Sequence, residues 1–214
     1  MSLMLHGYWR STASYRVRIA LNLKGVVYEQ AAHDLRTGAQ RDPAYLSLAP
    51  QGLVPALETP EGPLTQSLAI LDWIEDRWPE PALLPKDAYD RAVVRAMAGL
   101  IAADIHPLNN LRVLKVLREA FSASEDQVQN WIARWITDGF TALEAMIRQH
   151  GGAFAFGDRV SLADCLLVPQ LYSAERFSVD LAPFVHVRRV AAAALALAPV
   201  AAAHPSQQPD ADAP

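Results

Sequence analysis

Three closely spaced prolines divide the chain into two parts with different apolar patterns. Pro79, Pro81 and Pro85 restrict the backbone and lack an N–H group, so both helices and central strands should end here. Before them, short β-rich runs alternate with helical stripes, whereas the apolar spacing after them is helical throughout. The sequence therefore predicts an α/β domain at residues 1–80 and an all-helical domain at residues 87–204.

The first part has the order strand, helix, strand, loop, strand, strand, helix. The opening strand–helix–strand unit should cross over right-handedly, so its two strands are expected to pair in parallel. Pro55 lies inside the third apolar run, which indicates an edge, a bulge or a cis peptide bond. The predicted strands are residues 3–8, 26–31, 53–58 and 63–65, with a polar loop at residues 34–44 and helices that end at Gly25 and Pro79.

Three hydroxyl side chains lie between the first strand and the first helix. Ser11, Thr12 and Ser14 occupy a turn beside a helix N-terminus, where unpaired N–H groups and the helix dipole favour negative charge. One interpretation is that these side chains only cap the helix. Since one cap needs a single hydroxyl, the alternative is a site for an anion or a thiolate.

The second part begins with a long helical segment at residues 88–118, interrupted at Pro107. Ser161 and Asp164 have the spacing of a capping box and predict the start of a buried helix. Residues 205–214 combine prolines with short polar side chains, a composition that is typical of a disordered tail.

Composition excludes several classes of protein. Apolar residues make up 51% of the chain, but no apolar run is long enough to span a membrane. The net charge of -4 and the lack of a basic tract argue against a nucleic-acid partner. The single Cys165 excludes an internal disulfide, a Cys-x-x-Cys redox site and a cysteine-based metal site. Because the chain also opens without a secretory signal pattern, we expect a cytoplasmic protein without a metal.

The order of these elements and motifs resembles the cytosolic glutathione transferases over nearly the whole chain. Val54-Pro55 is similar to the cis-proline of this family, and Gln66-Ser67 is similar to its pair for the γ-glutamyl end of glutathione. Ser161 and Asp164 match its structural capping motif. The resemblance implies a thioredoxin-like first domain with a mixed four-stranded sheet, an all-α second domain, glutathione as the cofactor, and a homodimer.

Within this family, residues 11–21 are most similar to the zeta class, which includes maleylacetoacetate and maleylpyruvate isomerases. Thr12 replaces the second serine of the zeta signature, and Ala13 replaces its cysteine. Residues 104–112 and 174–180 also resemble these isomerases. The implied reaction is the glutathione-dependent cis–trans isomerisation of a maleyl keto acid, which is a small dicarboxylate.

The resemblance also assigns roles to individual residues. The expected catalytic residues are Ser11, which donates to the glutathione sulfur, with Thr12 and Arg10 beside it. The expected glutathione contacts are Ser11, Ala13, Gln40, Val54, Gln66, Ser67, His106 and Asn110. The expected substrate contacts are Arg10, Arg112, Arg176 and Asn109. Arginine suits this task because its planar fork binds a carboxylate through two donors.

The spacing of three of these residues predicts where they lie on a helix. His106, Asn109 and Asn110 are separated as i, i+3 and i+4, so a continuous helix would place them on one face. The alternative for His106 is a packed or capping histidine beside the proline kink. The arginines have a similar alternative as surface ion pairs, which contribute little energy.

The same fold and motifs are also compatible with other functions. A general or dehalogenating glutathione transferase would use the same thiolate activation. A non-catalytic protein of this fold is disfavoured, because a module that only binds a partner does not need the thiolate site to which Ser11, Gln66 and Arg176 would belong.

Overall fold

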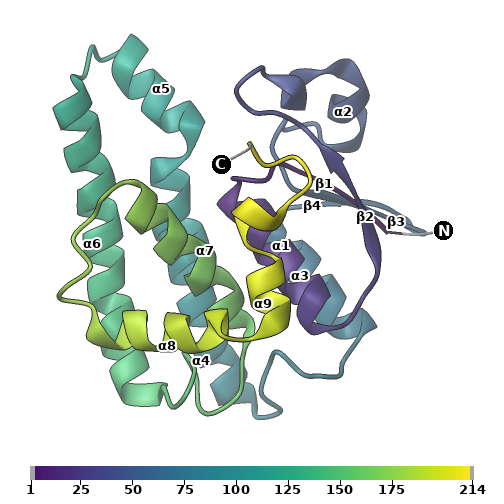
Figure 1. Cartoon of the computed structure of the whole chain (residues 1–214), viewed down its shortest axis with the longest axis vertical. Coiled ribbons are helices and arrows are strands. Elements are labelled where there is room, and N and C mark those ends of the chain that lie inside the picture. Colours follow the sequence, from purple (N-terminus) through teal and green to yellow (C-terminus); the bar gives the residue numbers. More distant parts are fainter. Residues whose placement is uncertain (1–2, 213–214) are drawn as a thin grey trace. The chain divides into compact units, whose positions relative to one another are not determined.

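The computed structural model describes residues 3–212, which form two compact units (Figure 1). One unit comprises the chain up to Leu83 together with the residues from Ala196 onward, and the other is Leu84–Leu195. The chain therefore passes to the second unit within the proline-rich stretch, between Leu83 and Leu84, and returns to the first unit between Leu195 and Ala196. Residues 196–204, which the sequence pattern assigns to the helical domain, belong to the first unit instead.

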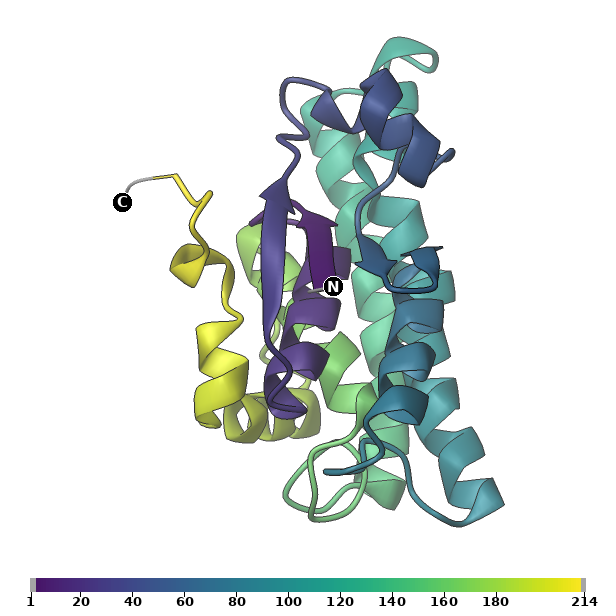
Figure 2. The same ribbon diagram turned by 90° about the vertical axis from the view of Figure 1, so that its right-hand side faces the viewer.

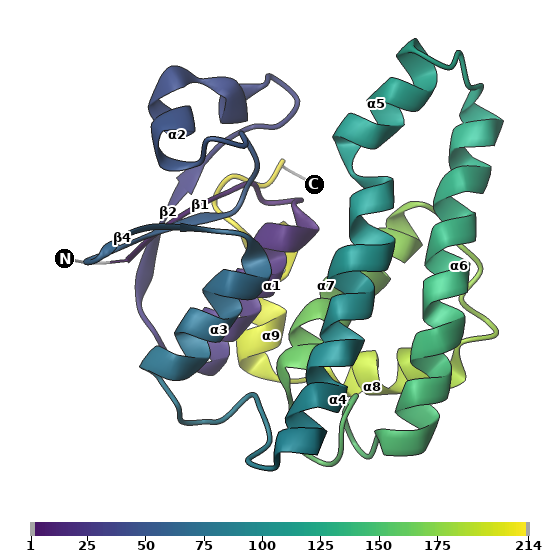
Figure 3. The ribbon, with the colours of Figure 1, turned by 180° about the vertical axis from the view of Figure 1, so that it is seen from behind.

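The first unit contains the expected mixed four-stranded sheet, and its strands lie in the order β2-β1-β3-β4. The two strands β1 (Leu3–Gly7) and β2 (Tyr28–Ala32) pair in parallel. Antiparallel pairing joins β1 to β3 (Ala56–Thr59), and β3 to β4 (Gly62–Thr65). Figure 3 shows helices α1 (Thr12–Leu23) and α3 (Ser67–Arg77) on one side of this sheet and α2 (Pro43–Leu48) on the other.

Helix α1 is buried along most of its length, and its end is fixed by local chemistry. Gly25 follows the helix with a φ of 64°, a left-handed conformation that favours glycine and stops the helix as predicted. Lys24 is buried, and its Nζ donates to Glu75 Oε2 at 2.5 Å and to the Pro81 carbonyl at 2.7 Å. These two contacts tie the end of α1 to α3 and to the segment that follows it.

The predicted polar loop at residues 34–44 is only partly correct. A 3-10 turn occupies Ala39–Arg41, and α2 begins at Pro43, where the fixed φ and missing N–H of proline suit the first turn of a helix. Tyr45 from α2 is 2% exposed, and its hydroxyl donates to the Leu53 carbonyl at 2.7 Å. The short helix is therefore held by burial of one aromatic ring and not by its own periodicity.

The second unit is built from helices. They include α4 (Ala88–Gly99), α5 (Leu111–Glu119), α6 (Glu125–His150), α7 (Leu162–Arg176) and α8 (Val185–Leu195). Between α4 and α5 the backbone widens into a π-helical segment at Leu100–Ile105 and then tightens into a 3-10 turn at His106–Asn109. Within residues 3–212, no helix is long and apolar enough to cross a membrane.

Two local features hold these helices together. Gly139 on α6 has no Cβ, and a Cβ there would lie 2.3 Å from the Ile105 side chain, so only glycine allows this close approach. The capping box predicted before α7 is confirmed: the Asp164 carboxylate accepts from the Ser161 N–H at 2.8 Å and from the Ser161 hydroxyl at 2.9 Å. Burial raises the pKa of Asp164, although these hydrogen bonds oppose the shift.

The C-terminal segment differs from the predicted disordered tail. Helix α9 (Ala198–Ala202) packs beside α1, and a 3-10 turn follows at Pro205–Gln207 (Figures 1 and 2). Gln208 is buried, and its Nε2 donates to the carbonyls of Ala202 and His204 at 3.1 and 2.8 Å. Polar contacts of this kind order the segment without an apolar pattern. The last two positions of the predicted tail lie outside the described residues.

A histidine cluster lies between the sheet and α2. His6 Nδ1 and His33 Nε2 are 2.9 Å apart, and His6 Nε2 lies 2.6 Å from Glu58 Oε1. The ring of Tyr45 packs against His33 with a centroid distance of 4.2 Å. Burial, and then the neighbouring His6, lower the pKa of His33.

This shift predicts a pH-dependent stability. Since the folded chain binds a proton at His33 less readily than the unfolded chain does, acid favours the unfolded state. The free energy of unfolding should therefore decrease as the pH falls from about 7 towards 5, through the ordinary histidine value of about 6.5. Urea titrations at several pH values measure this free energy. His33→Gln should make its dependence on pH flatter. If the same change at His186, outside the cluster, flattens it equally, His33 is not the source.

Candidate functional site

Ser11 ends a tight turn and begins a helix. Its N–H donates to the Tyr8 carbonyl at 2.9 Å, and its Oγ accepts from the Ser14 N–H at 3.2 Å as the N-cap of α1. The capping role is therefore confirmed for Ser11. It does not exclude the second role, because a hydroxyl has one donor and two lone pairs, and the cap uses one lone pair only. The capping bond therefore leaves the hydroxyl proton of Ser11 available for a hydrogen bond to another acceptor.

The surroundings of Ser11 favour negative charge. No acidic side chain lies in the first turn of α1, so the positive end of the helix dipole is not offset there. Thr12 and Ala13, in that first turn, are both buried, at 7% and 8% exposure. Both residues also carry backbone N–H groups of the first turn of α1. Arg10 is half-buried beside the turn, with its guanidinium 5.4 Å from the Trp9 ring.

A second helix N-terminus carries Gln66 and Ser67. Gln66 is exposed and has a positive φ of 69°, which is uncommon outside glycine and is often found at functional sites. Its Nε2 donates to Gln51 Oε1 at 2.6 Å. Ser67 begins α3 and accepts from Arg16 Nη1 at 3.2 Å. These contacts join α1, the N-terminus of α3 and the chain before β3.

Arg16 places a buried positive charge beneath this helix N-terminus. The side chain is 2% exposed, and burial lowers its pKa to about 10, so it stays protonated at neutral pH. Within residues 3–212, its Nε and Nη2 atoms are buried without a hydrogen-bond partner. A carboxylate bound at Ser67 would offset this charge. The sequence prediction missed Arg16, although a charged residue inside an apolar helical stripe is a usable signal.

The Val54–Pro55 peptide bond is cis, as predicted. Strand β3 begins at Ala56, three residues after the start of the strand predicted at residues 53–58. Val54 packs partly against the cluster of Tyr45, Ala49 and Ala56. Its backbone precedes the ladder and is suited to pair with an extended, peptide-like ligand.

Gln40 lies in the 3-10 turn before α2. Its Oε1 is buried and has no hydrogen-bond partner among the described residues. Gly52 approaches this turn closely, because a Cβ there would lie 3.0 Å from the Gln40 carbonyl oxygen. An unsatisfied buried amide of this kind is expected to have a partner in the functional state.

The second unit carries the remaining expected residues, and here one prediction is wrong. His106 and Asn109 lie in the 3-10 turn, whereas Asn110 is the N-cap of α5 and accepts from the Arg112 N–H at 3.1 Å. These residues do not share one face of a continuous helix, because Pro107 cannot supply an interior N–H and the helix ends there. Both polar side-chain atoms of Asn109 are buried and lack a hydrogen-bond partner among the described residues.

The two arginines of the second unit that were expected to bind substrate, Arg112 and Arg176, are exposed. Arg112 lies in the first turn of α5. Arg176 ends α7, and its guanidinium lies 4.6 Å from the centre of the Phe177 ring. Among residues 3–212, no cluster of His, Cys, Asp and Glu could hold a metal ion.

Comparisons with known proteins agree with the motifs. A family model for the glutathione S-transferase N-terminal domain matches residues 1–76. Maleylacetoacetate isomerase from Pseudomonas aeruginosa is 50% identical over 209 residues, which cover 96% of this chain and 97% of that protein.

Two solved structures are also similar over nearly the whole chain. The holo structure of a maleylpyruvate isomerase, a bacterial zeta-class glutathione S-transferase, has a TM-score of 0.95 and 47% identity, covering 98% of this chain and 100% of that one. A maleylacetoacetate isomerase from Methylobacterium extorquens with bound malonate and glutathione has a TM-score of 0.94 and 41% identity, with the same coverage. By its sequence and its fold, the chain belongs to the zeta class of the glutathione S-transferases.

Proposed function

We propose that this chain is a glutathione-dependent isomerase that converts a maleyl keto acid, maleylacetoacetate or maleylpyruvate, into its fumaryl isomer. The observation that carries the proposal is Ser11, a hydroxyl whose proton is not used by its capping bond, placed at the positive end of α1. The related enzymes that share the fold are named for this reaction.

The donors of the first unit suit glutathione. Gln66, Ser67 and the buried Arg16 would hold the carboxylate of the γ-glutamyl end at the N-terminus of α3. The backbone of Val54 would pair with the peptide-like middle of the molecule, and Gln40 would supply its unsatisfied amide. Ser11 and the Ala13 N–H would lie at the sulfur. Two contacts from the second unit, His106 and Asn110, complete the proposed set.

When bound, glutathione supplies a thiolate that adds reversibly to the maleyl double bond, so that the bond can rotate before the thiolate leaves. A free thiol has a pKa of about 8.5 and is mostly protonated at neutral pH, so the protein must favour the charged form. Ser11 does so by donating a hydrogen bond to the sulfur. Thr12 and Ala13 do so through the first-turn backbone of α1. These groups increase the fraction of reactive thiolate.

The arginines handle the charge of the substrate. A maleyl keto acid is a dianion, and attack on its double bond moves more negative charge onto its oxygen atoms. Arg10 and Arg176 would hold carboxylates through paired donors, with Arg112 as a third candidate. Asn109, whose amide is otherwise unsatisfied, would donate to a substrate oxygen.

Substrate comparison tests the function. Thiolate activation alone would serve a general or dehalogenating transferase equally well. The purified chain should be retained on immobilised glutathione and should convert the maleyl keto acid only when glutathione is present. Conversion of an uncharged electrophile with no turnover of either maleyl compound would contradict the proposal and favour the general transferase.

A homodimer is part of the proposal. Two-fold symmetric dimers are the commonest assembly of soluble proteins, and the resemblance to the transferase family implies one here. Light scattering at micromolar concentration should therefore give twice the 23.4 kDa mass of the chain. A mass of one chain at that concentration would contradict it.

A cytoplasmic location also belongs to the proposal. The single cysteine, Cys165, is buried and free, which is compatible with a reducing compartment. Fractionation of cells that express the chain should recover it with other cytoplasmic enzymes.

A further inference from the structure

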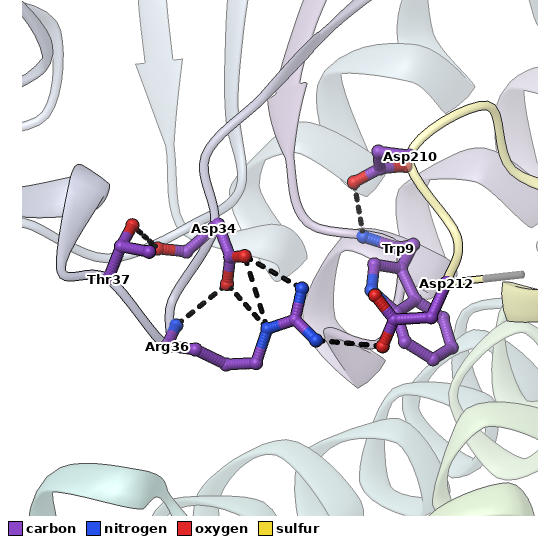
Figure 4. Close-up of polar contacts among 6 residues, drawn as sticks. All are labelled: Trp9, Asp34, Arg36, Thr37, Asp210 and Asp212. Atoms are coloured by element: carbon purple, nitrogen blue, oxygen red, sulfur yellow. Dashed lines mark hydrogen bonds and ion pairs between the residues drawn. The ribbon is translucent and has the colours of Figure 1, made fainter.

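Both backbone groups of Trp9 are bound by side chains from outside its own turn. The Trp9 N–H donates to Asp210 Oδ2 at 2.9 Å (Figure 4), and the Trp9 carbonyl accepts from Arg18 Nη2 at 2.9 Å. Trp9 is the second residue of the turn that the Ser11 N–H closes onto the Tyr8 carbonyl. The peptide that leads to Ser11 is therefore held on both sides.

Asp210 belongs to a segment that is attached to the first unit along its length. We call residues 203–212 the C-terminal strap. At its start, Arg18 Nε donates to the Ala203 carbonyl at 3.1 Å, so one guanidinium binds both the strap and the Trp9 carbonyl. In its middle, Gln30 Nε2 donates to Gln208 Oε1 at 3.1 Å. These contacts keep Asp210 within reach of the turn.

The end of the strap makes a contact of a different kind. Asp212 Oδ2 lies 2.7 Å from Arg36 Nη1, and Arg36 is also bound by both carboxylate oxygens of Asp34, at 2.8 to 3.1 Å (Figure 4). The two side chains are about half exposed, with 48% for Arg36 and 49% for Asp212. Since Arg36 keeps Asp34 when Asp212 is removed, and exposed pairs contribute little, this contact provides a matched control.

We propose that Asp210 is a positioning residue, which holds the Trp9 peptide so that the Ser11 hydroxyl points at the glutathione sulfur. The inference rests on the proposed function of Ser11. A carboxylate binds an N–H more strongly than a neutral acceptor does, so it can hold a turn that would otherwise bond to water. Small displacements of a donor from its reacting atom cause large losses of rate, which makes such a restraint useful.

Hydrogen exchange tests the restraint without any assumption about the reaction. In Asp210→Ala, the amides of the peptide that contains residues 8–12 should exchange about tenfold faster, because the Trp9 N–H loses its acceptor. In Asp212→Ala, the exchange of the same peptide should stay at the wild-type rate. Equal exchange in wild type and Asp210→Ala would overturn the proposal.

Kinetics and the thiol pKa test the consequence. Asp210→Ala should lower kcat about tenfold, keep the KM for glutathione within about twofold, and raise the pKa of the bound thiol. Asp210→Asn should recover part of kcat, because an amide oxygen still accepts a hydrogen bond. Asp212→Ala should behave as wild type. If Asp210→Ala only lowers the melting temperature and leaves kcat and the thiol pKa unchanged, the positioning role is overturned.

The wild-type measurement separates this inference from the proposed function. Ultraviolet absorbance of the thiolate gives the pKa of bound glutathione, which the wild type should hold below that of the free thiol. A wild type that leaves this pKa unchanged contradicts the proposed role of Ser11 and, with it, the positioning role. A wild type that lowers the pKa, together with an Asp210→Ala variant that lowers it equally, overturns the positioning role alone.

Discussion

Replacement of Ser11 by alanine is expected to lower kcat by roughly 10- to 150-fold and to change the KM for glutathione little. A hydrogen bond to a charged group contributes about 1.5–3 kcal/mol, and each 1.36 kcal/mol corresponds to about a tenfold change in rate. The hydroxyl would contact only the sulfur, whereas most of the affinity for glutathione should come from the contacts at Val54, Gln66 and Ser67. Steady-state kinetics on the maleyl substrate, together with the pKa of the bound thiol, measure the effect.

Two controls separate sulfur activation from capping. Ser11→Ala also removes the acceptor of the Ser14 N–H, and the loss of an N-cap typically costs about 1 kcal/mol of stability. Ser11→Thr keeps both the cap and the donor, so it should retain most of kcat. Ser14→Ala removes a neighbouring hydroxyl that is fully buried in the same turn, and it should leave kcat near the wild-type value. Unchanged kcat and thiol pKa in Ser11→Ala would move the activation to Thr12 or to the backbone.

Replacement of Arg176 by methionine is expected to raise the KM for the maleyl substrate by roughly 10- to 150-fold. The change deletes the paired donors to a carboxylate, worth about 1.5–3 kcal/mol for a charged hydrogen bond, at about 1.36 kcal/mol per tenfold. Methionine keeps an unbranched apolar stem that can still lie against the Phe177 ring, so little packing is lost. An uncharged electrophile has no carboxylate, and its turnover should stay nearly the same.

Arg134→Met is the matched control for this experiment. Arg134 is also an exposed arginine of the second unit, and its guanidinium lies 5.6 Å from the centre of the Trp135 ring. It should leave both substrates unaffected, while Arg176→Lys should rescue the KM in part by supplying charge without the planar fork. If Arg176→Met impairs the charged and the uncharged substrate equally, Arg176 is structural and the dicarboxylate assignment loses its main support.

Features with a local cause could be predicted from the sequence. Gly25 ends α1 because only the residue itself and its helix decide the left-handed conformation. The capping box of Ser161 and Asp164 depends on two residues three positions apart. Pro55 within an apolar run indicated an edge, a bulge or a cis bond, and the resemblance to the glutathione transferases favoured the cis bond that the structure has. In the first unit, periodicity indicated the four strands and the helices α1 and α3 to within a few residues at each end, whereas the 3-10 turn at Ala39–Arg41 and most of α2 were not predicted.

Sequence and tertiary structure thus determined different parts of this protein. The sequence by itself determined the strand–helix–strand order at the start of the chain, the helical second unit and the hydroxyl at the N-terminus of α1, because each depends on residues close together in the chain. Only the tertiary structure decided that Asp210 binds the Trp9 N–H and that Arg16 lies beneath Ser67. The reason is physical: a hydrogen bond between distant residues forms when the fold brings them together, and it leaves no periodic pattern in either segment.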